Sequence, residues 1–122
     1  MLYTVLIYGE PGLFDRLPPE EQEAALKKHR ELQRVLQEKG TFKTALRLMP
    51  PSTAMTVTEK AAKPMVLDGP YTETKEQILG LYLFEAGSME EAVEAAKILP
   101  QGISSMEVRP VMWGGGADDS HP

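Results

Sequence analysis

The order in which strand-like and helix-like patterns follow one another constrains the fold of this chain more than any single motif. Residues 2–8 are rich in β-branched and aromatic side chains and end at a glycine and proline cluster, which predicts a buried strand. A helix is predicted to follow to about Lys39, with Pro18 and Pro19 in its first turn and Gly40 just beyond its end. The later patterns predict a strand, a hairpin, a central strand, a helix and a last strand, over residues 42–48, 54–68, 78–84, 89–99 and 106–112.

Two strand–helix–strand units with a hairpin between them predict a ferredoxin-like α+β fold. Such a fold has the order βαββαβ, here with a β-hairpin insertion, and packs both helices on one face of an antiparallel sheet. No further element is left to cover the other face, so we expect a homodimer, sheet against sheet, in a dimeric α/β-barrel-like assembly. Residues 1–113 are predicted to form a single domain, and residues 114–122 a flexible C-terminal tail.

The first helix carries one stripe that is predicted to face the sheet. At 100° per residue, Ala25, His29, Leu32 and Leu36 fall on the same side. His29 is therefore predicted to point toward the sheet rather than into solvent. A histidine in such a place is either a core residue bonded to a backbone carbonyl or part of a functional site.

Three details of the packing are also predicted. Phe42, Leu46 and Leu48 alternate with charged residues, which predicts that they share one buried face of the second strand. Trp113 is expected to cover the end of the core. Residues 9–17 are expected to form a loop.

Composition argues against several classes of function. With 13 basic and 18 acidic residues the chain has a formal charge of -5, so nucleic acid is not an expected partner. There is no cysteine, which excludes disulfides, thiolate nucleophiles and cysteine-ligated zinc. His29 and His121 are the only histidines, and we expect no metal site and no cofactor. The first eight residues are too short for a signal peptide or a membrane span, so a cytoplasmic protein without a membrane partner is predicted.

The segment from Asp68 to Glu76 is the candidate site. It gathers carboxylates, an ammonium group, hydroxyls and an aromatic ring between two apolar runs, and its glycine before a proline indicates a tight bend. We expect a cleft here for a small-molecule ligand, lined by Tyr8, Tyr71, Glu73, Lys75 and Glu76. The alternatives are a solvated loop for the charged residues, a turn role for Asp68, and simple packing for the tyrosines.

Five short segments, spread over almost the whole chain, match a known family pattern. They are Leu6-Ile7-Tyr8-Gly9, His29-Arg30, Pro51 with Thr53-Ala54, Asp68-Gly69-Pro70-Tyr71 with Glu73-Thr74-Lys75-Glu76, and Glu107-Val108-Arg109-Pro110-Val111. On these residues the chain resembles the YCII-related family, specifically its DGPF-type branch. Tyr71 stands where the name of the branch has a phenylalanine.

The resemblance implies a dimeric ferredoxin-like protein with a cleft near the dimer interface. It also implies a histidine and aspartate dyad, proposed as catalytic in the wider family, which transfers to His29 and to Asp68 before Gly69-Pro70. One characterised relative eliminates chloride from a chlorinated aromatic metabolite. Some members are encoded beside, or fused to, extracytoplasmic-function sigma factors, which implies an association with such a factor.

Two classes of function follow. The first is a lyase or isomerase acting on a small polar or aromatic metabolite, with His29 as general base and Asp68 orienting its ring. The second is a non-catalytic ligand-binding or regulatory module, acting with a sigma factor. The enzyme needs His29 and Asp68 within hydrogen-bond reach, directly or through a water, and open to a pocket. The binding module does not.

Overall fold

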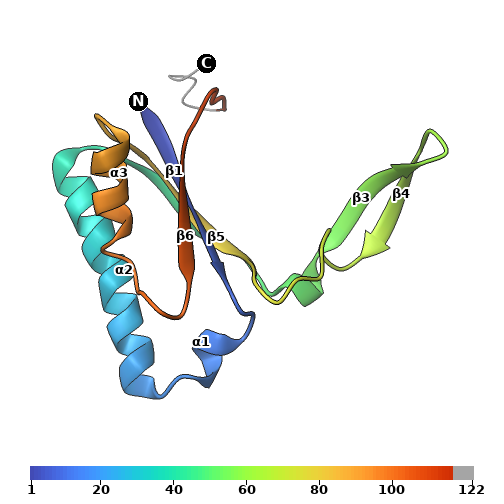
Figure 1. Cartoon of the computed structure of the whole chain (residues 1–122), viewed down its shortest axis with the longest axis horizontal. Coiled ribbons are helices and arrows are strands. Elements are labelled where there is room, and N and C mark those ends of the chain that lie inside the picture. Colours follow the sequence, from blue (N-terminus) through green and yellow to red (C-terminus); the bar gives the residue numbers. More distant parts are fainter. Residues whose placement is uncertain (117–122) are drawn as a thin grey trace.

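A four-stranded antiparallel sheet with helices on one face forms the body of the molecule (Figure 1). The computed structural model describes residues 1–116. The strands lie in the order β2-β5-β1-β6, and all three neighbouring pairs are antiparallel. Their bounds are Leu2–Gly9 for β1, Phe42–Arg47 for β2, Gln77–Glu85 for β5 and Ser105–Pro110 for β6. The helices are α1 (Leu13–Arg16), α2 (Pro19–Lys39) and α3 (Met89–Ala96), with a 3₁₀ turn, η1, at Pro51–Thr53. This arrangement confirms the predicted ferredoxin-like α+β fold.

The predicted hairpin insertion is present as a separate two-stranded sheet, here called the arm. It consists of β3 (Met55–Lys60) and β4 (Lys63–Asp68), joined by Ala61 and Ala62. Both alanines have positive φ, at 53° and 65°, as a two-residue hairpin turn requires. The arm projects away from the sheet on the side opposite α2 and α3 (Figure 1).

Local sequence signals begin α2 and α3 and end α2 where they were predicted, whereas α3 ends at Ala96 and not at the predicted residue 99. α2 has Pro19 at its first position, and Gly40 ends it in the left-handed region at φ 71°, where glycine carries no steric cost. At the start of α3, Ser88 Oγ accepts the Glu91 N–H at 3.2 Å. The Glu91 carboxylate in turn accepts the Gly87 N–H at 2.9 Å. This reciprocal capping explains why α3 starts at Met89, directly after Ser88.

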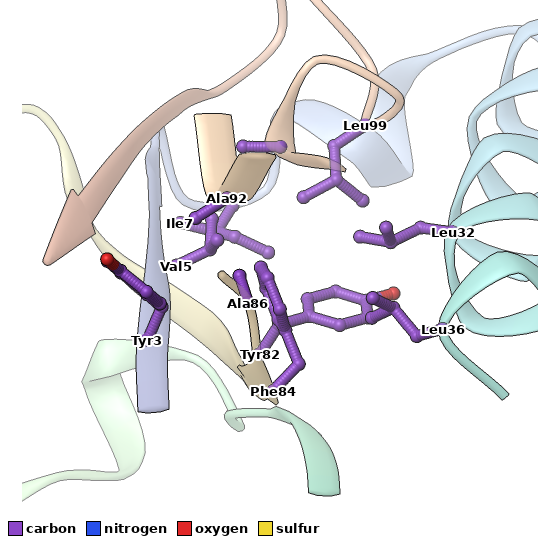
Figure 2. Packing of buried hydrophobic residues seen from close by; sticks show 11 residues of the cluster. Tyr3, Val5, Ile7, Leu32, Leu36, Tyr82, Phe84, Ala86, Ala92 and Leu99 are labelled. Atoms are coloured by element: carbon purple, nitrogen blue, oxygen red, sulfur yellow. The ribbon is translucent and has the colours of Figure 1, made fainter. Parts of the chain in front are cut away.

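The core lies between the sheet and the two long helices (Figure 2). The predicted stripe of α2 is confirmed, since Ala25, Leu32 and Leu36 are buried and His29 is partly buried. Figure 2 shows side chains from α2, α3 and the sheet meeting in one layer. Its most completely buried large members are Phe84, Leu32, Leu99 and Val5.

The second strand does not bury the face that its alternation predicts. The register between β2 and β5 shifts between Phe42 and Thr44, so that one extra residue of β2 is accommodated there. Phe42 and Ala45 pack against the core, whereas Leu46 is 55% exposed on the other face and Leu48 is also exposed. The prediction was wrong because a bulge reverses the side on which the following residues point.

Two further expectations were wrong. Trp113 is 70% exposed and does not cover the core, because β6 ends at Pro110 and the chain then leaves the sheet. The predicted loop over residues 9–17 contains the short helix α1. The predicted tail is described only at residues 114–116, and the rest of it lies outside the described residues.

The sheet face that points away from α2 and α3 is called the outer face. Val5, Ile7, Tyr82 and Phe84 point into the core, so the residues that alternate with them point outward. The outer face carries Leu6, Tyr8, Leu46, Leu81 and Leu83 in its middle. Within residues 1–116, no helix packs on this face, and none is long and apolar enough to cross a membrane.

Candidate functional site

His29 lies at the interface between α2 and β5, where it contacts Tyr82. Its Nδ1 is 2.9 Å from Tyr82 Oη, and the two rings stack with their centroids 5.9 Å apart. Gln33, one helical turn further along α2, donates its side-chain N–H to the same Oη at 3.2 Å. The prediction that His29 points toward the sheet is confirmed. The spacing of His29 and Gln33 on one helix face brings both onto a single tyrosine hydroxyl.

The hydrogen bonds of Tyr82 favour one tautomer of His29. Oη accepts from Gln33 and has one hydrogen of its own to donate. It lies 2.9 Å from His29 Nδ1 but 3.5 Å from the His29 carbonyl oxygen, so donation to Nδ1 is favoured. Nε2 then carries the ring hydrogen. In this tautomer His29 offers a donor at Nε2, and not the lone pair that a general base needs there.

Burial lowers the pKa of His29 below its ordinary value of 6.5, and the positive charge of Arg47 lowers it further. The Arg47 guanidinium lies over the Phe14 ring, 5.1 Å from its centroid. Burial also raises the pKa of the Tyr82 hydroxyl, although the hydrogen bond from Gln33 opposes this. His29 and Tyr82 are therefore both neutral at pH 7.

The lowered pKa of His29 predicts how stability depends on pH. The unfolded chain takes up a proton near pH 6.5 and the folded chain only at lower pH, so the contribution of His29 to stability is complete above about pH 6.5. It is lost as the pH falls from there through the folded pKa. Measured by thermal unfolding at about pH 8 and about pH 5.5, the Tm of wild type is expected to fall more than that of His29→Gln.

A matched control for this experiment is His121→Gln, which removes the only other histidine. This variant should keep the full wild-type drop in Tm between the two pH values. Carboxylates contribute equally to the pH dependence of all three proteins and cancel in the comparison. Equal drops in wild type and His29→Gln would contradict the lowered pKa.

Asp68 lies far along the chain from this cluster, at the end of β4 in the arm. Its side chain is exposed, and Figure 1 shows β4 on the opposite side of the sheet from α2. Within residues 1–116, His29 and Asp68 share no hydrogen bond or ion pair. The predicted bend after Asp68 is present: Gly69 has φ 93°, and its N–H donates to the Ala54 carbonyl at 2.8 Å.

The other predicted site residues fall into three places. Tyr8 points from β1 onto the outer face. Tyr71 and Glu73 are exposed in the segment between the arm and β5, Tyr71 to 83%. Lys75 and Glu76 line a groove on the helix side of the molecule. A single chain therefore brings Lys75 and Glu76 together, but it does not join them with His29 or Tyr8 in one cleft.

The groove has a volume of about 750 Å³ and lies between α3, β6 and the residues that follow β1. Its apolar lining comes mainly from Met89, Val93, Ala96, Met106 and Val108. Charged and polar side chains line it as well, namely Glu10, Lys75, Glu76, Lys97 and Gln101. Neither His29 nor Tyr82 is among the lining residues, and β1 separates β5, the strand of Tyr82, from β6.

Four charged side chains line the groove, and two of them form ion pairs with neighbouring residues. Glu10 lies 3.5 Å from Arg16, and Lys97 lies 2.8 Å from Glu94. In the part of the chain that the structure describes, Lys75 and Glu76 have no such ion-pair partner. One cation and one anion therefore remain available to a ligand at the groove.

Sequence reasoning missed Glu10 and the contributions of α3 and β6 to this groove. The available signal was the small side chain of Ala96, which lines the groove from α3. Over residues 1–116 the structure contains no group of three or more histidine and carboxylate side chains placed to hold a metal ion.

Two comparisons with known proteins each cover most of the chain. A protein of Rhizobium meliloti (strain 1021), described as uncharacterised, is 37% identical over 114 residues, which span 91% of this chain and 92% of the relative. The family model of the YCII-related domain matches residues 1–113. Assignment to the DGPF-type branch stays a prediction. The chain belongs to the YCII-related family.

Proposed function

We propose that this protein binds a small amphipathic metabolite in the groove between α3 and β6. The groove itself carries the proposal. Its volume of about 750 Å³ is within the range of small-molecule sites, roughly 300 to 1,000 Å³. Apolar side chains from α3 and β6 with a few charged groups around them are the usual composition of such a site.

The lining indicates the chemistry of the ligand. Met89, Val93 and Met106 suit an aromatic or aliphatic body, since methionine adapts to irregular shapes. Lys75 and Glu76 suit a polar or charged head, because neither is neutralised by a neighbour among residues 1–116. A small polar molecule with an apolar or aromatic body fits both requirements.

The position of His29 supports binding over proton transfer as the activity of this groove. Its imidazole is not among the groove residues, its Nδ1 is hydrogen-bonded to Tyr82 Oη, and β4, which ends at Asp68, lies on the other side of the sheet. An enzyme that uses His29 and Asp68 as a dyad needs both at one pocket. A binding or regulatory module needs only the groove.

Proton transfer by His29 is the second candidate function. It is favoured by the lowered pKa, which keeps the ring neutral and able to accept a proton near pH 7. In this case the ring takes the other tautomer, with Nδ1–H donating to Tyr82 Oη and Nε2 acting as the base. Asp68 would then come from a second copy of the chain. The sigma-factor association stays a prediction.

Binding is tested with benzoate and benzylamine, which share an aromatic body and differ in the sign of the head charge. We expect amide NMR shifts around α3 and β6 with at least one of them, with a Kd on the order of 1 mM. Val93→Trp fills the groove and should abolish these shifts. Lys75→Met should weaken benzoate selectively, because it removes the cation but keeps the length of the side chain.

His29→Gln is the variant that separates the two candidate functions. It leaves the groove intact, so the shifts should be the same as in wild type if the protein is a binding module. Probe shifts that centre on His29 and Tyr82 in wild type, and disappear in His29→Gln, would instead support the proton-transfer site. Absence of shifts with both probes, or unchanged shifts in Val93→Trp, would reject the groove as the ligand site.

A further inference from the structure

β6 is an edge strand, and one of its edges carries unpaired backbone groups. In the described part of the chain it pairs with β1 alone. Just beyond β6, the Val111 N–H donates to the Leu2 carbonyl at 2.8 Å, so the odd-numbered positions of β6 turn their backbone groups toward β1. The even-numbered positions turn theirs away from it. The free edge of β6 therefore presents the N–H and C=O groups of Met106 and Val108.

Pro110 agrees with this alternation. Proline has no N–H, and position 110, opposite Tyr3, is one whose N–H would point to the free edge. On the other side of β1, the Ala86 N–H donates to the Met1 carbonyl at 2.9 Å. The odd-numbered residues of β1 therefore face β5 and the even-numbered ones face β6. Both ladders give the same alternation for β6.

The groove lies beside this free edge. α3 packs against β6, and its two sides meet different surroundings. Ala95 and Ile98 line a small pocket with Leu36 of α2. Met89 and Val93 are on the other side of α3, away from α2, and line the groove. An apolar helix face and the open edge of a strand therefore form the two walls of the groove.

The unpaired backbone groups identify the class of partner. Another extended polypeptide offers N–H and C=O groups at the spacing of a strand. Met106 and Val108 point to the helix side of the sheet, because they lie opposite Ile7 and Val5, which point into the core. A strand added beside them would turn every second side chain into the groove.

The remaining side chains of such a strand would lie on the outer face. They would stand beside Glu107 and Arg109, which alternate with Met106 and Val108 and form an ion pair with each other. Charged neighbours suit polar side chains. The expected partner therefore has apolar side chains at every second position and polar ones between them.

We propose that β6 accepts an extended peptide segment of another protein as a fifth, antiparallel strand of the sheet. Antiparallel pairing matches the rest of the sheet and is slightly more stable per residue than parallel pairing. Hydrogen bonds to Met106 and Val108 supply affinity, and the groove selects apolar side chains. The inference adds a polypeptide to the ligands of this groove, and it rests on the proposed function only in requiring that the groove admits apolar groups.

Amide hydrogen exchange, followed by NMR, tests the free edge directly. In the free protein the amides of Met106 and Val108 should exchange at least about 100-fold faster than those of Glu107 and Arg109, which face β1. A capped six-residue peptide in which valine alternates with threonine and lysine should bind with a Kd on the order of 0.1 mM and slow both fast amides. If the two amides are already protected without peptide, a second copy or another segment of the chain covers the edge, and the proposal is overturned.

The peptide also supplies a matched control. Its valines point into the groove, so in antiparallel pairing their amides face β6, whereas the amides of the threonines and lysines face away. N-methylation of two valine amides should weaken binding at least about 10-fold, because it removes two hydrogen bonds. N-methylation of two of the other amides should leave the Kd within about 2-fold. Equal effects of the two patterns, or peptide-induced shifts centred on β2, would overturn the proposal.

A pair of variants tests the same hydrogen bonds from the side of the protein. Val108→Pro removes an N–H from the free edge, whereas Val108→Ala shortens the side chain and keeps the N–H. The proline variant should bind the peptide at least about 5-fold more weakly than the alanine variant. Pro110 shows that this edge accepts a proline, and thermal unfolding checks that both variants fold. Equal affinities of two folded variants would contradict pairing at Val108.

Benzoate and benzylamine separate this inference from the proposed function. If they bind wild type and the peptide does not, the peptide inference is wrong and the proposed function stands. If the peptide binds with the expected N-methyl pattern and neither small probe binds, the peptide inference stands alone. If nothing binds, both are wrong.

Discussion

Replacing Gly80 by alanine is expected to lower the free energy of unfolding by about 3 kcal/mol or more. A Cβ atom at Gly80 would clash with the Leu46 carbonyl oxygen and would stand 3.3 Å from Arg47 Cα. Both atoms belong to the backbone of β2, which pairs with β5 here, so no side-chain rotation relieves the clash. β2 must move away from β5, and the ladder hydrogen bonds beside Gly80 are strained or lost. Urea unfolding monitored by circular dichroism measures the change.

Gly87→Ala is the matched control for this substitution. Its Cβ would meet only the Glu91 carboxylate, at 3.0 Å, which lies at the end of a flexible side chain. We expect a loss of no more than about 1 kcal/mol, mainly from disturbing the cap of α3. If both variants lose the same amount, the close approach of β2 to β5 is not what requires glycine at position 80.

Leu32→Ala is expected to cost about 2 to 5 kcal/mol of unfolding free energy. Leu32 is 0% exposed and packs in the layer between α2, the sheet and Leu99 (Figure 2). Truncation removes its contacts and leaves a cavity that the rigid sheet cannot close. The free energy of unfolding of Leu32→Ala is measured by urea unfolding, as for Gly80→Ala.

Leu26→Ala, on the same helix, is the control for this truncation. Leu26 is 38% exposed, so the loss should be below about 1 kcal/mol once the small difference in helix propensity is included. A loss as large as that of Leu32→Ala would mean that the surface of α2 at Leu26 is covered in solution.

Most of the fold was predictable because its signals are local. The α2 stripe, the Gly40 stop and the Ser88 cap each depend on residues within a few positions, and the structure contains all three. The order of elements then restricts the sheet to few topologies. The bulge in β2 was not predictable from alternation, because an extra residue leaves the apolar pattern unchanged while it reverses the side of Leu46.

The candidate site was predicted less well, because its residues are far apart in the chain. The alternation of residues in an inserted hairpin predicts its strands but not the direction in which the hairpin leaves the sheet. Because Asp68 ends this hairpin, its position relative to His29 could not be predicted. Tyr82 was assigned only to a buried strand, although its hydroxyl is what orients His29. Lys75 and Glu76 were expected at a cleft and do line a groove, but the walls come from α3 and β6.

The first strand of the chain, β1, lies between β5 and β6 in the sheet. Both of these strands are synthesised long after β1. Leu2 pairs with Glu85, and Tyr8 pairs with Ser105, so neither ladder can start until more than half of the chain has been synthesised. Until then β1 is an apolar strand with two unpaired edges. Pairings between such distant segments are slow to form, and they leave aggregation-prone edges open while the chain waits.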